Sequence, residues 1–335
     1  MGLRKKIRVI QYGLGPIGIE TARLVLKKSG MAIVGAVDIS KDIAGKDLGE
    51  VLGLKEKLGI AVTDDAKGLF ARTQADVALH TTGSRFKKIY PDLEAMIGAG
   101  LNIISSSEEL LFPLKENSEW SERVDRLAKQ NGVTVLGTGV NPGFVMDALP
   151  LFLTGVCQDV KRIHVERHVD AGTRRLPLQK KVGAGMAEKA FREQIAKKAM
   201  GHVGLLESLH LVAGNLGMTL DDVHEAVEPV ITGKAVRTKF FSLQPGDVAG
   251  IKHTAEGIKD GEKVITLDLR MYVGCEQPHD AVHIVGTPEI RLRIEGGVAG
   301  DQATAAVLVN SIPPVIDARP GLATVKDLPA AHFTR

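Results

Sequence analysis

The sequence has few of the residues that mark specialised protein classes. Only two of its 335 residues are cysteines, Cys157 and Cys275, and neither stands at a metal-ligand spacing or close to the other. A disulfide framework is therefore not expected, and a reducing compartment fits best. The formal net charge is only +3, which gives no reason to expect nucleic acid or a membrane surface as a partner.

Long apolar runs are also missing. The longest uncharged stretch, residues 130–146, is interrupted by glycines and a proline and is too short to cross a bilayer. The N-terminus is charged and leads directly into a strand-like run, unlike a signal peptide. Hydrophobic residues make up 44% and charged residues 25% of the chain, as in ordinary globular proteins of one or two domains. We therefore expect a soluble, cytoplasmic protein.

The clearest motif lies in residues 7–38. A β-type run is followed by a glycine loop, a helical segment, a second apolar strand and Asp38, 20 residues after the third glycine. In such a unit the first glycine makes the tight turn, the second lets a pyrophosphate approach the backbone, and the third lets helix pack on strand. The start of the helix attracts phosphate, and the acid accepts hydrogen bonds from the adenosine ribose. The loop residues are Gly13, Leu14, Gly15, Pro16, Ile17 and Gly18.

The glycine pattern alone is weak evidence in a chain with 37 glycines, where a merely tight turn is the alternative. The flanking strands and the correctly spaced acid favour a dinucleotide site. Asp38 suits the free 2′-hydroxyl of NAD, whereas Ser40 and Lys41 just beyond it could receive the 2′-phosphate of NADP. We therefore expect NAD or NADP as the cofactor, with both able to bind.

Strand and helix patterns alternate through the first part of the chain. This alternation predicts an α/β fold with a doubly wound parallel sheet of the Rossmann type. Thr81, Thr82 and Gly83 follow one of the strands, at the end that faces the nicotinamide side of a cofactor. The expected strands are residues 75–79, 101–104 and 133–136, and the expected helices are residues 91–98 and 118–130.

The pattern changes after residue 145. Residues 160–169 alternate in β fashion with charge on one face, as in a half-exposed sheet. The sequence thus predicts a Rossmann domain of residues 1–145, joined by residues 303–335, and an α+β domain of residues 146–302 for substrate binding and dimerisation. Its sheet is expected to be mostly antiparallel. Further strands are expected at residues 264–273, 281–285 and 290–294, and helices at residues 186–216 and 303–316.

Glu108 is the best-placed candidate for proton handling, because it follows the strand of residues 101–104 directly. Glu109 is either the alternative or a partner that raises the pKa of Glu108. The structural alternative is that both acids simply begin a helix. Asn141 lies in a turn after the last Rossmann strand, where it either hydrogen-bonds the cofactor or serves only as a turn residue.

A basic loop in the second domain contains Arg174, Arg175 and Lys181, which either bind an anionic group or are solvated. The histidines are scattered without the spacing of a zinc site, so no metal is expected. His168 is the histidine that the strand alternation directs toward the cleft. There is no G-x-S-x-G, and neither cysteine has a neighbouring base, so covalent catalysis is not expected.

Several longer strings resemble the family of 2,4-diaminopentanoate dehydrogenases and related native amine dehydrogenases, whose fold is like that of dihydrodipicolinate reductase. The resemblance runs nearly from end to end and is more specific than the glycine motif. The strings are RVIQYGLGPIG (8–18), DLGEVLGL (47–54), NIISSSEELLFP (102–113), TGVNPGFVMD (138–147), RRLPLQKKVGAG (174–185), GHVGLLES (201–208), HDAVHIVGTP (279–288) and VNSIPPVIDARPGL (309–322).

The resemblance implies NAD(P)-dependent oxidative deamination of a primary amine or diamino acid, and the reverse amination of a ketone or aldehyde with ammonia. In the family the glutamate after the Ser-rich strand end is taken as the catalytic carboxylate, and it matches Glu108. A carboxylate there would stabilise the iminium cation and accept protons from the ammonium group and from water. By the same matching, the substrate cavity would be lined by Val140, Asn141, Phe144, His168, Thr173 and Pro177.

Other readings remain open. The paired-His, Lys and Ser-Gly-Thr signature of true dihydrodipicolinate reductases is missing, but a reductase of that or the homoserine dehydrogenase type would work without ammonia. A non-catalytic NAD(P)-binding sensor would bind cofactor without turnover. A diamino acid needs a cation for its carboxylate, which Arg174, Arg175 or Lys181 could supply; a plain amine fits better if these face solvent. A homodimer through the sheet of the second domain is expected from the architecture.

Overall fold

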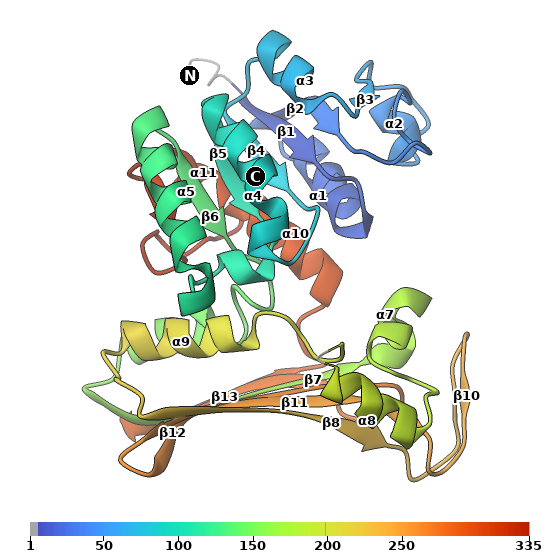
Figure 1. Cartoon of the computed structure of the whole chain (residues 1–335), viewed down its shortest axis with the longest axis vertical. Coiled ribbons are helices and arrows are strands. Elements are labelled where there is room, and N and C mark those ends of the chain that lie inside the picture. Colours follow the sequence, from blue (N-terminus) through green and yellow to red (C-terminus); the bar gives the residue numbers. More distant parts are fainter. Residues whose placement is uncertain (1–5, 198, 335) are drawn as a thin grey trace. The chain divides into compact units, whose positions relative to one another are not determined.

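The computed structural model describes residues 6–197 and 199–334. The chain divides into two compact units, which are described separately below (Figure 1). Unit 1 comprises Met1–Phe144 and Ala299–Arg335, and unit 2 comprises Val145–Val298. Among the described residues, no helix combines the length and the apolarity that a membrane span requires.

The described residues of unit 1 form a seven-stranded sheet in the order β15-β6-β5-β4-β1-β2-β3. All its neighbouring strands are parallel, which confirms the doubly wound sheet. The strands are β1 (Ile7–Tyr12), β2 (Met31–Val37), β3 (Val62–Thr63), β4 (Val77–His80), β5 (Asn102–Ser105), β6 (Thr134–Gly137) and β15 (Gly321–Ala323).

Helices cover both faces of this sheet because its strands are apolar on both sides. Val9 and Leu79 pack with residues of α1 and α10, and the adjacent Ile10 and Ala78 pack with residues of α4 and α5. The helices are α1 (Pro16–Leu26), α2 (Leu48–Val51), α3 (Ala66–Arg72), α4 (Phe86–Gly98), α5 (Ser118–Asn131), α10 (Gly300–Asn310) and α11 (Ile312–Ile316), with the 3₁₀ turns η1 (Glu108–Leu110) and η2 (Lys115–Asn117).

Two helix predictions for unit 1 need correction: the helix expected over residues 303–316 is two helices, α10 and α11, and the helix expected over residues 91–98 starts earlier. Helix α4 begins at Phe86 rather than at the expected residue 91, and Pro91 lies inside it. The N–H of Phe86, at the first turn of the helix, donates to the carboxylate of Glu109 at 2.7 Å. This contact from a residue 23 positions away fixes the helix start, and it overrides the usual preference of proline for a first turn.

The described residues of unit 2 form a six-stranded sheet in the order β14-β13-β7-β12-β11-β8. Only β7 and β12 pair in parallel; the other neighbours are antiparallel, as expected. The strands are β7 (Asp159–Asp170), β8 (Asp222–Ile231), β11 (Val248–Lys259), β12 (Glu262–Tyr272), β13 (His279–Thr287) and β14 (Ile290–Glu295), beside a two-stranded ribbon of β9 (Val236–Arg237) and β10 (Ser242–Leu243).

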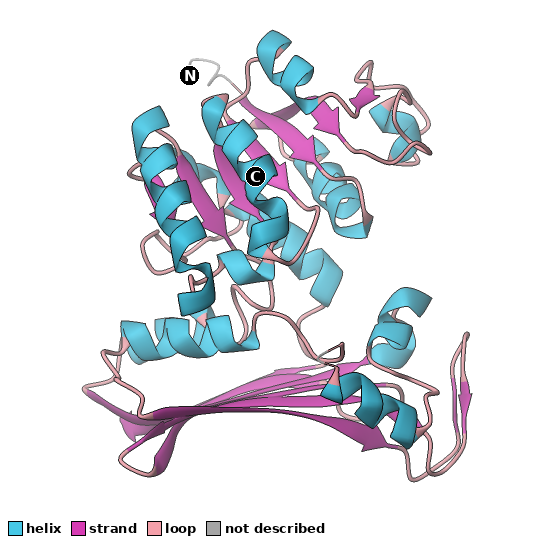
Figure 2. Cartoon of the chain, in the orientation of Figure 1, coloured by secondary structure: helices cyan, strands magenta, loops and turns pink. Residues whose placement is uncertain are grey.

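One face of this sheet is covered by helices, as Figure 2 shows. Helix α9 packs against β11 and β12, and α8 packs against β8. Along β7, Ile163, Val165 and Arg167 are buried, whereas the alternate residues are only half buried. We call the face of these alternate residues the helix-free face. The helical segments are α6 (Ala148–Thr154), α7 (Leu176–Lys181), α8 (Glu188–Ala196), α9 (Leu205–Asn215) and the 3₁₀ turn η3 (Ala171–Thr173).

The single helix expected over residues 186–216 is wrong, because two helices, α8 and α9, occupy that region. Gly201 and Gly204 between them have φ angles of +126° and +102°. Such a backbone conformation is incompatible with a continuous right-handed helix. The apolar periodicity continues through the break, which explains why pattern alone joined the two helices.

Candidate cofactor and catalytic site

The glycine loop between β1 and α1 has the geometry of a phosphate cradle. Gly13 has a φ of +90°, and a Cβ on Gly18 would lie 2.0 Å from the carbonyl oxygen of Gly13. The turn and the close approach of helix to strand therefore require glycine at both positions. A Cβ on Gly15 would meet no atom within 4 Å, so the middle of the loop opens onto free space.

Helix α1 begins directly behind this space. Gly15 is its N-cap, Pro16 is its first residue, and no side chain caps it. An uncapped helix N-terminus presents backbone N–H groups and the positive end of the helix dipole. The loop and the helix start together fit a pyrophosphate, so this part of the chain suits a dinucleotide cofactor.

The side chain of Thr81 holds the glycine loop in place. Its hydroxyl donates to the carbonyl of Gly13 at 2.9 Å and accepts from Nε2 of Gln11 at 3.0 Å. The hydroxyl of Thr82 instead lies 2.8 Å from Nε2 of His80. Thr82 and Gly83 are exposed at the carboxyl end of β4. Among the expected cofactor residues, Thr81 thus contacts the loop itself.

Beneath these strand ends lies a polar network that the sequence alone did not predict. His80 is fully buried, with Nδ1 2.9 Å from the hydroxyl of Ser105. The hydroxyl of Tyr12 donates to Asp92 at 2.9 Å. Burial, followed by the charge of Asp92, raises the pKa of Tyr12. Burial by itself raises the pKa of Asp92, but hydrogen bonds from His80 and Tyr12 outweigh it and lower that pKa. The network braces the ends of β1, β4 and β5.

Asp38 lies at the carboxyl end of β2 with its carboxylate oriented by two backbone donors. The N–H of Leu14 donates to Oδ2 at 2.6 Å, and the N–H of Ser40 donates to Oδ1 at 2.8 Å. Since two carboxylate oxygens offer about four acceptor sites, capacity for a ribose remains. Lys41 is 88% exposed and pairs with Asp64 at 3.1 Å.

Glu108 and Glu109 have different environments. Glu109 accepts hydrogen bonds from Arg85 at 2.6 Å and from the N–H of Phe86 at 2.7 Å. Glu109 therefore holds the start of α4 in place. Glu108 opens η1, half buried, three residues after the end of β5. Asn141 follows the neighbouring strand β6, in the loop that also carries Val140 and Phe144. Glu108 and this loop thus share one edge of the sheet.

The remaining expected substrate residues belong to unit 2. Thr173 and Pro177 are exposed on η3 and α7, as are Arg175 and Lys181, while Arg174 is half buried. This loop is organised by Gln179, which is fully buried and donates to the carbonyls of residues 172 and 174.

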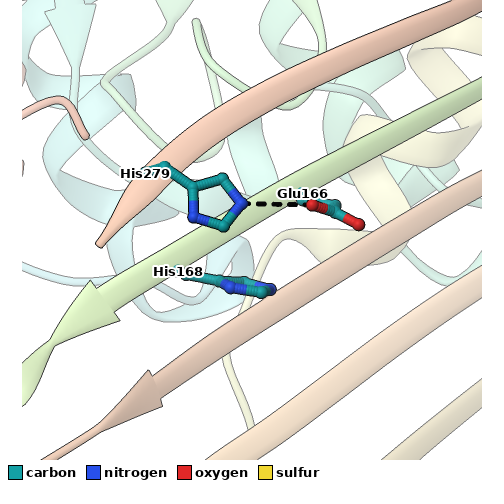
Figure 3. Close-up of side chains that lie close together, drawn as sticks. All are labelled: Glu166, His168 and His279. Atoms are coloured by element: carbon teal, nitrogen blue, oxygen red, sulfur yellow. Dashed lines mark hydrogen bonds and ion pairs between the residues drawn. The ribbon is translucent and has the colours of Figure 1, made fainter. Parts of the chain in front are cut away.

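His168 lies on the helix-free face of the unit 2 sheet, next to Glu166 and His279 (Figure 3). His279 Nε2 is 3.1 Å from Glu166 Oε2, and the rings of His168 and His279 are 4.4 Å apart. Burial by itself raises the pKa of Glu166, but hydrogen bonds from His279 and His164 lower it to about 2. Burial, with the nearby His279 and Arg270, lowers the pKa of His168. The sequence alone did not predict that these side chains lie together.

Comparison with known proteins agrees with this architecture. Residues 144–334 match the model of the 2,4-diaminopentanoate dehydrogenase C-terminal domain, and residues 7–107 match that of the dihydrodipicolinate reductase N-terminus. A 2,4-diaminopentanoate dehydrogenase of Acetoanaerobium sticklandii is 34% identical, over 97% of this chain and 94% of its own. The chain belongs to the 2,4-diaminopentanoate dehydrogenase family.

Two further relatives agree with this membership. An amine dehydrogenase of Streptomyces virginiae is 24% identical over 96% of both chains. The solved structure of an amine dehydrogenase from Mycobacterium smegmatis superimposes with a TM-score of 0.86 at 28% identity, covering 99% of this chain and 98% of that one. The family, the fold and the enzyme class expected from the sequence are confirmed. The chain is a dehydrogenase of the amine-oxidising class, and it uses a nicotinamide cofactor.

Proposed function

We propose that the chain catalyses the NAD-dependent oxidative deamination of a short-chain diamino acid of the 2,4-diaminopentanoate type. In the reverse direction it forms the amine from the corresponding ketone and ammonia. The observation that carries the proposal is the position of Glu108 on the same sheet edge as the glycine loop, while its neighbour Glu109 is engaged by α4. The name of the relative at 34% identity supports the substrate class.

In this proposal unit 1 binds the cofactor and unit 2 contributes to the substrate site. A nicotinamide cofactor bound there would supply the hydride-accepting group for oxidation of the amine-bearing carbon. The carboxylate of Glu108 stabilises the resulting iminium cation and accepts a proton from the attacking water. The amine, water and NAD⁺ thus give the carbonyl compound, ammonium and NADH. On unit 1, Val140, Asn141 and Phe144 are proposed to contact the substrate; on unit 2, Thr173 and Pro177 are proposed to do so.

A diamino acid also requires a partner for its carboxylate. Arg174 is half buried, whereas Arg175 and Lys181 are exposed. An ion pair screened from water is stronger than one at the surface. Arg174 is therefore the best of the three cations for this role, and a simple amine would make no use of it.

The cofactor is proposed to be NAD rather than NADP. Leu14 and Ser40 hold the carboxylate of Asp38 at the ribose position, where its charge repels a 2′-phosphate. Lys41, which would attract that phosphate, is paired with Asp64. Ile39 is 81% exposed beside Asp38 and offers an apolar surface for the adenine.

The chain is further proposed to form a homodimer through the helix-free face of the unit 2 sheet. In the described residues of unit 2, helices cover only the other face (Figure 2). Domains are generally built from packed layers, and a second copy would supply the missing one. Light scattering coupled to size exclusion tests this, and a monomer at micromolar concentration would contradict it.

The deciding experiment follows NADH oxidation with 2-amino-4-oxopentanoate and with small ketones, each with and without ammonium. Ammonium-dependent oxidation that is fastest with the amino-oxo acid is expected. Oxidation without ammonium would indicate an ordinary reductase, and preference for a plain ketone would indicate a simple amine as substrate. Cofactor binding without any turnover would indicate a sensor.

The role of Glu108 is tested by Glu108→Gln, with Glu116→Gln at an exposed site as the matched control. We expect Glu108→Gln to lower kcat by at least about 100-fold, the usual contribution of a positioned acid–base group, while NADH affinity stays within a factor of two or so of the wild type. Glu116→Gln should behave as wild type. Loss of NADH binding in Glu108→Gln would make Glu108 a structural residue instead.

A further inference from the structure

The helix-free face of the unit 2 sheet brings three potential metal ligands together. β7 and β13 are antiparallel neighbours, and His168 stands directly opposite His279 in their register. Glu166 lies two residues before His168, so its side chain leaves the strand on the same face. One oxygen of Glu166 and one ring nitrogen of each histidine all lie within 4.8 Å of one another (Figure 3).

Both ring nitrogens of His279 face hydrogen-bond acceptors. Nδ1 lies 2.8 Å from the carbonyl oxygen of Gln277, which only accepts, so Nδ1 carries a hydrogen. Nε2 faces Oε2 of Glu166 at 3.1 Å, and this atom is also an acceptor. A ring with acceptors at both nitrogens either carries a second proton or coordinates a cation through Nε2.

The surroundings match the outer shell of a metal site. Metal-binding histidines commonly donate their other ring N–H to a backbone carbonyl, as His279 does to Gln277. Glu166 is oriented in turn by His164, whose Nε2 lies 3.0 Å from Oε1. Oε2, on the side of His279, is thereby the oxygen left to bind a cation.

The environment of His168 also indicates a bound cation. Its Nε2 is buried and has no hydrogen-bond partner among the described residues. Buried polar atoms are nearly always paired, and each exception calls for an explanation such as an ion. Arg270 stands opposite His168 in the register of β12 with β7, and its guanidinium donates two hydrogen bonds of 3.0 and 2.7 Å to Asp268. Its positive charge is therefore largely balanced there and opposes a cation only weakly.

We propose that Glu166, His168 and His279 form a binding site for a first-row divalent transition metal of the Zn²⁺ type. Two imidazoles and one carboxylate are a donor set for such ions, whereas Mg²⁺ and Ca²⁺ take oxygen ligands. Bonds of about 2.0–2.2 Å in a tetrahedron separate ligand atoms by about 3.3 Å. The Glu166–His279 pair already has this spacing at 3.1 Å. Three protein ligands leave a fourth coordination position for a water molecule, on the face that the second copy is proposed to cover.

The proposal does not depend on the amine dehydrogenase activity. The metal would join β7 to β13, whose ligands Glu166 and His279 are 113 residues apart in the sequence. Metal binding should therefore stabilise unit 2 of the intact chain. The competing explanation is a purely protonic network, in which Glu166 is shared by His164 and His279 and no metal binds.

The test uses untagged full-length protein, treated with chelator, dialysed and titrated with ZnCl₂ by calorimetry and by competition with a chromophoric chelator. Four variants are compared: His168→Asn, His279→Ala, His164→Ala and His283→Ala. The last is the matched control, because His283 is a β13 histidine that pairs with Glu289 outside the cluster. Circular dichroism and NADH binding verify that each variant folds.

We expect about one Zn²⁺ per wild-type chain and an increase in Tm on binding. Loss of a direct ligand in His168→Asn or His279→Ala should weaken binding by at least about 100-fold, and loss of the outer-shell His164 by about 10–100-fold. His283→Ala should bind as wild type. The Co²⁺-loaded protein should show visible d–d absorption that His168→Asn lacks. Absence of micromolar Zn²⁺ binding, or equal binding by all the variants, would overturn the proposal in favour of the protonic network.

Discussion

A buried ion pair in unit 2 allows a quantitative prediction of stability. Arg167 and Asp280 are only 3% and 1% exposed, and one guanidinium nitrogen lies 2.8 Å from each carboxylate oxygen. The same guanidinium donates to the carbonyl of Val298 at 2.9 Å, and the N–H of Val298 donates back to Asp280 at 2.7 Å. Burial lowers the pKa of Arg167, and the neighbouring Asp280 opposes that change.

Asp280→Ala removes the counter-charge and the acceptor of one backbone N–H while Arg167 stays buried. Breaking such a pair costs about 3–5 kcal/mol. At about 2–4 °C per kcal/mol for a domain of this size, the Tm of unit 2 should fall by roughly 6–20 °C. The double variant Arg167→Met/Asp280→Leu should recover much of this loss, because it leaves no charge buried without a partner.

Differential scanning calorimetry on the intact chain measures both effects, since it separates the transitions of the two units when they differ. Glu289→Gln is the control, because Glu289 and Arg291 form an exposed ion pair, and no measurable change in Tm is expected. A Tm loss below about 2 °C for Asp280→Ala, or a double variant as unstable as the single one, would refute the reasoning.

Two further predictions concern unit 1. Asp38→Ala should lower the ratio of kcat/KM for NAD to that for NADP by at least about tenfold. Removing the repulsion between Asp38 and the 2′-phosphate, worth about 1.4 kcal/mol, has this effect. An unchanged ratio would mean that Asp38 does not contact the ribose. The pKa of Asp92 in the folded chain lies below its ordinary value of 3.8, so ionised Asp92 stabilises the fold above that value and loses this effect as the pH falls below it. Urea midpoints should therefore separate the wild type from Asp92→Asn more widely at pH 7 than at pH 3, and a gap of equal size at both would contradict the assignment.

The unit 1 fold could be predicted because its signals are local. Each strand is a short apolar run, and each helix has its own apolar periodicity and a residue that ends it. Gly132, for example, ends α5 by adopting a φ of +67°. Where a distant contact decides, the prediction failed. The start of α4 depends on Glu109, 23 residues beyond Phe86, and no pattern within residues 86–98 contains that information.

The unit 2 fold was harder to predict for the same reason. β8 and β11 were not singled out from the sequence, because β8 combines acidic residues with Pro229 and β11 carries Gly250 and Gly257. Both gain their partners through antiparallel pairing with each other. Strand preference depends on neighbours across the sheet more than helix preference does, so these strands become evident only once the sheet is assembled.

The two candidate sites differ in the same way. The dinucleotide site is written into one continuous segment, where glycine spacing, helix start and Asp38 all fall within residues 7–38. The cluster of Glu166, His168 and His279 depends instead on the register of β7 against β13. A shift of one residue in that register would move His279 to the opposite face of the sheet, into the layer of Arg167 and Val165.

No spacing rule within either strand contains this information: Glu166 and His168 lie two residues apart, a separation typical of one strand face rather than of the helical zinc motifs. Metal ligands carried by paired strands are therefore found from sheet register, and Zn²⁺ binding by this chain would be direct evidence for the pairing of β7 with β13.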